Sequence, residues 1–86
     1  MHRVIIAEDR ATMRNTLRHL LTVYGNLDVC GEAEDGQQAV DAAIALKPDL
    51  VLLDFKMPNG GGLKAASEIN EKLPETPRNV HSLQDR

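Results

Sequence analysis

Three acidic residues in this chain of 86 residues each follow an uninterrupted apolar run. Glu8 and Asp9 come after residues 3–7, and Asp54 comes directly after residues 50–53. Apolar runs without alternation are typical of parallel strands that are covered on both faces. Because parallel strands end at the same edge of a sheet, we expect the three carboxylates to lie close together there.

Such a cluster has a chemical interpretation and a structural one. Carboxylates held together repel one another, so that either a proton or a cation must neutralise them. A set of oxygen ligands without histidine or thiolate favours a hard divalent ion such as Mg²⁺. Beside that ion, Asp54 can act as the nucleophile that accepts a phosphoryl group. In the structural interpretation, Glu8 and Asp9 cap the next helix and Asp54 only ends its strand.

The segment between the two apolar runs predicts a helix, a strand and a second helix. Apolar residues recur at helical spacing over residues 10–24, and Gly25 follows where a left-handed cap is expected. Residues 27–33 alternate apolar and polar side chains, which indicates a half-covered strand at a sheet edge. Asp35 and Gln38 have the spacing of a capping box, which predicts the start of the second helix.

The rest of the chain predicts a loop, a third helix and a polar tail. Residues 55–62 contain a proline and three consecutive glycines, and residues 63–73 resume helical spacing. Residues 74–86 contain only two apolar side chains, so we expect an extended or disordered tail. The sequence therefore predicts one α/β domain over residues 1–73, with a parallel sheet, three strand–helix units and neither a fourth nor a fifth strand.

The composition argues against several other classes of protein. With 42% hydrophobic and 27% charged residues the chain should fold, while a net charge of −3 and two aromatic residues argue against nucleic-acid binding. The single cysteine, Cys30, cannot form an internal disulfide. No apolar stretch approaches the ~18 residues that a membrane span needs. We therefore expect a cytoplasmic protein without a membrane anchor.

Arginines stand at positions 10, 14 and 18 of the first predicted helix. A spacing of four residues places their guanidinium groups on one helix face. This face is interpreted either as a solvated surface or as a stripe that binds a partner.

Four segments of the sequence resemble the receiver domain of bacterial two-component response regulators, the family with the CheY-like fold. They are the acidic pair Glu8-Asp9, the turn Glu34-Asp35-Gly36, the run Lys47-Pro48-Asp49-Leu50-Val51-Leu52-Leu53-Asp54, and Asp54-Phe55-Lys56-Met57-Pro58 with Gly62 four residues after the proline. The resemblance covers about residues 3–73. It implies a flavodoxin-like topology with the strand order 2-1-3-4-5.

The resemblance also implies a function and a set of site residues. The chain would be the phosphoacceptor module of a response regulator rather than an enzyme, with a sensor histidine kinase as its partner and Mg²⁺ as its cofactor. The implied residues are Asp54 as the phosphoacceptor, Glu8, Asp9, Asp54 and the backbone carbonyl of Lys56 as metal ligands, and Met57, Pro58 and Gly62 as the family's loop.

The end of the chain departs from the family's pattern after about residue 77. The family continues through two further strand–helix units, and its phosphoryl-pairing lysine has no counterpart after Lys72. Ser82 has about the right spacing for the family's switch hydroxyl, but polar residues 78–81 precede it, so the alternative is that Ser82 is a tail residue. Without a fourth strand, residues 50–53 would form an exposed apolar edge, which predicts a homodimer or strand exchange.

Two other functions compete with the receiver interpretation. One is an inactive, truncated receiver fragment that acts only through protein–protein contacts, as the polar tail suggests. The other is a metal-dependent phosphohydrolase with an aspartyl nucleophile. Such enzymes of the haloacid dehalogenase type place a second acid two residues after the nucleophile, where this chain has Lys56.

Overall fold

The computed structural model describes residues 2–54, 61–73 and 79–82, which form alternating strands and helices. In chain order the elements are β1 (Arg3–Ala7), α1 (Ala11–Val23), β2 (Asp28–Ala33), α2 (Gly36–Leu46), β3 (Leu50–Leu53), α3 (Gly61–Lys72) and β4 (Asn79–Ser82). The strands pair in parallel in the order β2-β1-β3-β4. This confirms the predicted parallel α/β sheet with flavodoxin-like topology, and it confirms β2 as an edge strand.

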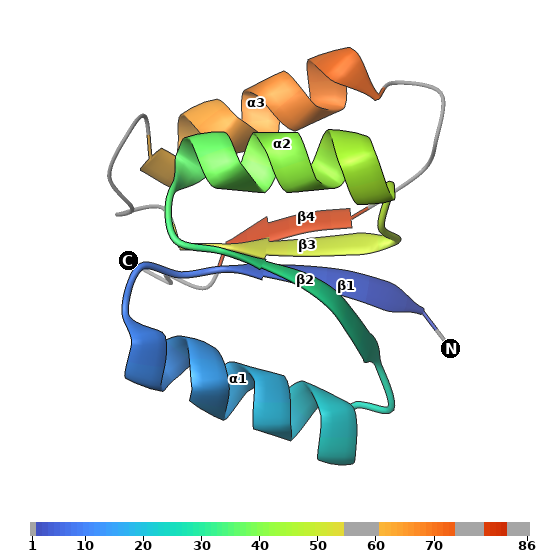
Figure 1. Ribbon diagram of the computed structural model, residues 1–86. Helices are drawn as coiled ribbons and strands as arrows, with labels where there is room; N and C mark the ends of the chain where they lie inside the picture. Colours follow the sequence, from blue (N-terminus) through green and yellow to red (C-terminus); the bar gives the residue numbers. More distant parts are fainter. Residues whose placement is uncertain (1, 55–60, 74–78, 83–86) are drawn as a thin grey trace.

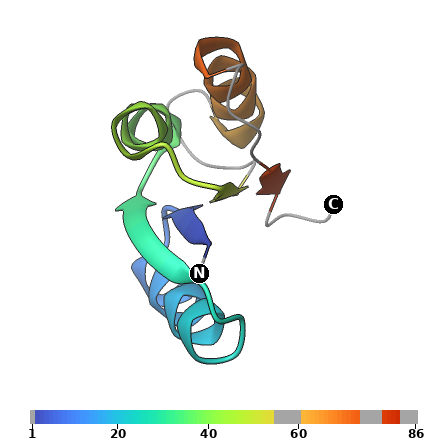
Figure 2. The same ribbon diagram turned by 90° about the vertical axis from the view of Figure 1, so that its right-hand side faces the viewer.

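The helices cover the two faces of the sheet unequally. Figures 1 and 2 show α2 and α3 side by side on one face and α1 alone on the other. None of the helices within residues 2–54 and 61–73 has the length and apolar character needed to cross a membrane. The sheet therefore lies between a two-helix layer and a one-helix layer.

The fourth strand corrects the prediction from the sequence. Residues 79–82 form β4, which pairs in parallel with β3 along its whole length, from Leu50–Asn79 to Leu53–Ser82. The sequence argument required an apolar run, whereas an edge strand is held by main-chain hydrogen bonds that any residue except proline supplies. Because β3 lies between β1 and β4, the expected exposed edge at residues 50–53 is wrong, and the argument for dimerisation or strand exchange through it fails.

The apolar core lies mainly on the α2–α3 side of the sheet. Fully buried side chains from both layers meet there, among them Ile5, Val51, Leu53, Val40 and Ile69. On the opposite side, none of the residues of α1, all of which the structure describes, is buried. The burial of apolar surface, which is the main stabilising contribution to folding, is therefore concentrated under α2 and α3.

A glycine in β2 allows α2 to approach the sheet closely. A Cβ atom at Gly31 would lie 2.8 Å from the Cδ1 atom of Leu46, the last residue of α2. The register between β1 and β2 shifts beside it, since Val4 pairs with Val29 and Ile5 pairs with Gly31. The missing side chain and the irregular register together let the end of α2 pack over β2.

The predicted capping box at the start of α2 is present in a modified form. The side chain of Asp35 accepts a hydrogen bond of 2.8 Å from the backbone N–H of Gln38. The side-chain oxygen of Gln38 accepts in return from the N–H of Glu34, at 2.9 Å, one residue before the cap. Two main-chain donors at this helix start are thus satisfied by side chains.

The left-handed residue after α1 is Asn26 rather than the expected Gly25. Asn26 has φ 54°, while the N–H of Gly25 donates 3.2 Å to the carbonyl of Leu20. Asparagine tolerates the left-handed region better than other residues with a side chain. The turn therefore forms one residue later than the glycine indicated.

Replacing the cap of α2 should lower the stability of the fold. We expect Asp35→Ala to reduce the free energy of unfolding by about 1 kcal/mol, because the N–H of Gln38 loses its acceptor. Urea denaturation followed by circular dichroism measures the change. Asp41→Ala is the matched control, since Asp41 is exposed and accepts a hydrogen bond from the Gln37 side chain within the helix. An equal loss of stability in both variants would contradict the role of the cap.

Candidate functional site

The carboxyl ends of three strands form the floor of the candidate site. Ala7 pairs with Leu53, so the next residues, Glu8 and Asp54, lie at the same edge of the sheet. The N–H of Asp54 donates 3.1 Å to the carbonyl of Ala7, and the N–H of Glu8 donates 3.0 Å to the carbonyl of Ala33. The main chain beneath both acids is thus fixed by hydrogen bonds between strands.

Glu8, Asp9 and Asp54 come together as the sequence predicted. Each offers one carboxylate oxygen, and these oxygens all lie within 4.8 Å of one another. Glu8 is 1% exposed and Asp54 is 4% exposed, whereas Asp9 is open to solvent. A set of three carboxylate oxygens, with one of its members facing water, fits a hard divalent cation that keeps several waters.

The buried carboxylate of Glu8 is held by Arg10. The Nε atom of Arg10 donates 2.8 Å to Oε2 of Glu8, and a terminal guanidinium nitrogen donates 3.2 Å to Oε1. The backbone N–H of Arg10 also donates to Oε2, at 2.9 Å. These bonds, with the side-chain contact to Arg10 foremost, lower the pKa of Glu8 from 4.5 to about 2, although burial opposes the shift. Glu8 is therefore ionised at neutral pH.

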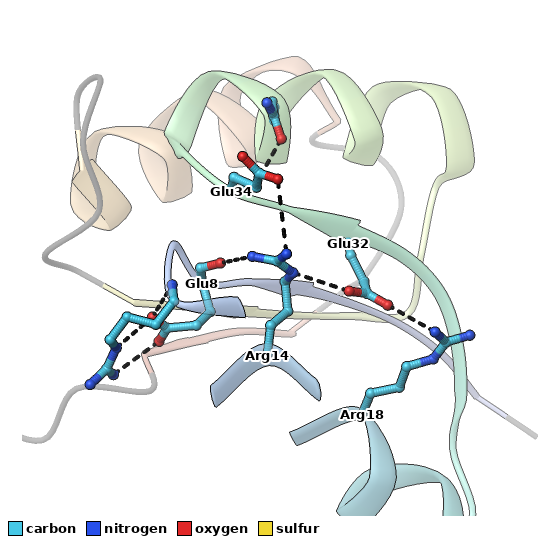
Figure 3. A network of polar contacts seen from close by, with 7 residues as sticks. Glu8, Arg14, Arg18, Glu32 and Glu34 are labelled. Atoms are coloured by element: carbon cyan, nitrogen blue, oxygen red, sulfur yellow. Dashed lines mark hydrogen bonds and ion pairs between the residues drawn. The ribbon is translucent and has the colours of Figure 1, made fainter. Parts of the chain in front are cut away.

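Arg14 connects α1 to the ends of β1 and β2 (Figure 3). One of its terminal nitrogens donates 2.7 Å to the backbone carbonyl of Glu8, and its Nε donates 3.1 Å to Glu32. A further ion pair of 3.9 Å reaches Glu34, and Arg18 pairs with Glu32 at 3.2 Å. The arginine face of α1 therefore contacts the sheet. The sequence had suggested either a solvated surface or a stripe that binds a partner, and neither included this contact.

The spacing of the arginines predicted that they share one helix face, but it did not predict their partners. Glu32 lies eighteen residues after Arg14 in the chain, and only the parallel pairing of β1 with β2 brings it beside α1. Acidic residues on an edge strand opposite a basic helix face are the sequence signal that could have indicated this network.

The remaining predicted site residues have different outcomes. Lys56, Met57 and Pro58 lie outside the described residues. Gly62 is buried in the first turn of α3. Ser82 is the last residue of β4 and pairs with Leu53, the neighbour of Asp54, so it belongs to the sheet and is not a tail residue.

Comparisons with known proteins agree on one family. The model of the response regulator receiver domain matches residues 4–86. The transcriptional regulatory protein PdtaR of Mycobacterium tuberculosis is 51% identical over 70 residues, which are 81% of this chain and 34% of PdtaR. The crystal structure of the response regulator domain of Thermotoga maritima CheB has a TM-score of 0.85 and 37% identity, and the likeness covers 95% of this chain and 60% of that chain.

The chain therefore belongs to the response regulator receiver domain family of two-component systems. A CheX-CheY complex with BeF3 and Mg from Borrelia burgdorferi also resembles it, with a TM-score of 0.85 and 26% identity over 99% of this chain and 64% of that chain. The family match reaches residue 86, beyond the residues 3–73 over which the sequence resembles the family. The chain spans about a third of the length of PdtaR.

The low pKa of Glu8 predicts how stability depends on pH. Because the folded-state pKa lies below the ordinary value, the ionised carboxylate stabilises the fold above pH 4.5, and this contribution is lost as the pH falls toward 2. Carbon-13 NMR of the Glu8 carboxyl, without added divalent cation, measures the titration directly. A Glu8 resonance that titrates at pH 4.5 or above would contradict the contact with Arg10.

Removing Arg14 should destabilise the fold more than removing Arg18. The Arg14 side chain is 14% exposed, and we expect Arg14→Met to cost about 2 kcal/mol through lost charge-assisted hydrogen bonds. Arg18 is 58% exposed, so Arg18→Met should cost no more than about 0.5 kcal/mol. Urea denaturation of both variants makes the comparison. Equal costs would show that Arg14 does not hold β1 and β2 to the helix.

Proposed function

We propose that this protein accepts a phosphoryl group on Asp54 from a sensor histidine kinase, in the presence of Mg²⁺. The observation that carries the proposal is the group of three carboxylates within 4.8 Å at the carboxyl edge of a receiver-family sheet. The protein is itself the acceptor and needs no external substrate, so it is not an enzyme in the ordinary sense. We place this reaction in the cytoplasm, where the kinase domain presents its phosphohistidine.

The transfer is a displacement at phosphorus. One carboxylate oxygen of Asp54 forms a bond to phosphorus while the bond from phosphorus to the imidazole nitrogen of the donor breaks. With a proton on the other ring nitrogen of the phosphohistidine, the imidazole takes the electron pair of the broken bond and leaves as the neutral ring, and Asp54 becomes an acyl phosphate. The burial of Asp54 limits the access of water, which would hydrolyse this mixed anhydride.

The other acids hold the cation that makes the approach of two anions feasible. Glu8, Asp9 and Asp54 would bind Mg²⁺, together with the backbone carbonyl of Lys56 that the family resemblance supplies. When bound, the ion neutralises charge on the carboxylates and on the incoming phosphoryl oxygens. The related complex from Borrelia burgdorferi, which contains BeF3 and Mg, supports this assignment by analogy.

Ser82 is proposed as the hydroxyl that responds to phosphorylation. Its support is the register of β4, which aligns Ser82 with Leu53 and so sets it at the same edge of the sheet as Asp54. A residue at this position is adjacent to the strand end that carries the acceptor. Met57, Pro58 and Gly62 are proposed to shape the loop that follows Asp54.

Phosphorylation by a small donor tests the acceptor directly. With Mg²⁺ and acetyl phosphate we expect one phosphoryl adduct in the intact mass spectrum, and we expect Asp54→Asn to abolish it because the amide is not a nucleophile. Removal of Mg²⁺ by a chelator should also abolish the adduct.

The control for this experiment is Asp49→Asn. Asp49 lies at the opposite end of β3, where it accepts a hydrogen bond from the N–H of Arg3. This variant should keep the adduct, and circular dichroism should show that both variants are folded. A folded wild-type protein without any adduct would favour the inactive fragment, which acts through protein contacts alone.

A further inference from the structure

The guanidinium group of Arg10 lies on the solvent side of the Glu8 carboxylate. The Arg10 side chain is 60% exposed, whereas the Glu8 side chain is 1% exposed. Two guanidinium nitrogens donate to the two carboxylate oxygens, at 2.8 and 3.2 Å. The pair therefore has a forked geometry, in which an exposed guanidinium group covers a buried carboxylate.

This contact occupies three of the about four lone-pair positions through which Glu8 could bind a metal ion or its water. The Oε2 atom accepts from both Nε and the backbone N–H of Arg10, and Oε1 accepts from the terminal nitrogen. An ionised carboxylate oxygen has two lone pairs, so Oε2 accepts at both of its sites, while Oε1 keeps one of its two. A cation, or a water bound to it, gains Oε2, or both oxygens of Glu8 together, only when the Arg10 side chain gives up at least one hydrogen bond.

Arg14 does not compete in this way. It donates to the backbone carbonyl of Glu8 at 2.7 Å and to Glu32, and its own side chain is mostly buried. Its contacts are compatible with a cation on the carboxylates. The two arginines thus have different roles, because Arg14 of α1 holds the main chain of Glu8 while Arg10, just before the helix, holds its carboxylate.

We propose that Arg10 is an exchangeable internal counter-ion, which holds Glu8 while no divalent cation is bound and releases it when one binds. This inference rests on the proposed function, since it concerns the same cation site. Arg10 is a positioning residue, not a catalytic one. Its consequence is a weakened affinity for Mg²⁺, because binding must first break the fork.

A comparison of Mg²⁺ affinities tests the proposal. Isothermal titration calorimetry of the full chain with Mg²⁺ should give a dissociation constant about fivefold lower for Arg10→Gln than for wild type, since the competing charge-assisted bonds are gone. Arg10→Lys keeps the charge without the fork and should lie between the two. Arg10→Gln should also melt at a lower temperature than wild type when Mg²⁺ is absent, because the contact that competes with Mg²⁺ stabilises the metal-free fold.

Arg18→Gln is the matched control. Arg18 lies in α1, eight residues after Arg10, and is 58% exposed, and its partner is Glu32 instead of Glu8. The charge change is identical, so its Mg²⁺ affinity should stay within about twofold of wild type if the effect needs contact with the acidic edge. An equal rise in Mg²⁺ affinity in Arg18→Gln would show that any loss of positive charge has this effect, and it would overturn the proposal.

The wild-type protein provides a second readout that needs no variant. The Nε–H proton of Arg10, observed through its bonded nitrogen-15, should exchange slowly with solvent without Mg²⁺ and faster when Mg²⁺ is added. Retained protection at saturating Mg²⁺, or an unchanged or weaker affinity in Arg10→Gln, would overturn the role of Arg10 but leave the phosphorylation of Asp54 standing. Absence of Mg²⁺ binding in wild type and in Arg10→Gln alike would overturn both proposals.

Discussion

The carboxylates of Glu8, Asp9 and Asp54 lie close enough to repel one another, and the fold must offset this unfavourable electrostatic energy. The register of β1 and β3 aligns Ala7 with Leu53, so the acids that follow cannot separate unless the ladder between the strands breaks. The connection from β1 to α1 is short, and it brings Arg10 directly onto the buried acid. The opposing charge is thus supplied by the residues next in the chain.

The two faces of the sheet stabilise this arrangement by different means. Under α2 and α3 the sheet is held by closely packed aliphatic side chains, and this side fixes the positions of the strands. On the other face Val4 and Ile6 of β1 are fully buried, but no residue of α1 is, and ion pairs from Arg14 and Arg18 to Glu32 hold the helix to the edge strand. Hydrophobic burial therefore fixes the geometry of the acidic edge, while the arginines of α1 place positive charge beside it.

Local patterns were enough to predict most of this fold and the core of its site. Runs and periodicities gave three strands, three helices and the convergence of Glu8, Asp9 and Asp54, because each depends on the order of neighbouring residues. β4 was missed, since a short edge strand depends on main-chain pairing with β3 and needs no apolar run. The partners of Arg14 were missed because strand pairing, and not spacing, brings Glu32 to the helix.

The shallow burial of α1 has a dynamic consequence. The helix contributes no buried residue of its own, so its local opening should cost less free energy than global unfolding. Opening would withdraw Arg14 from the backbone carbonyl of Glu8, since this contact comes from the first turn of the helix. The hold of α1 on the sheet would then depend on the charges at the ends of β1 and β2.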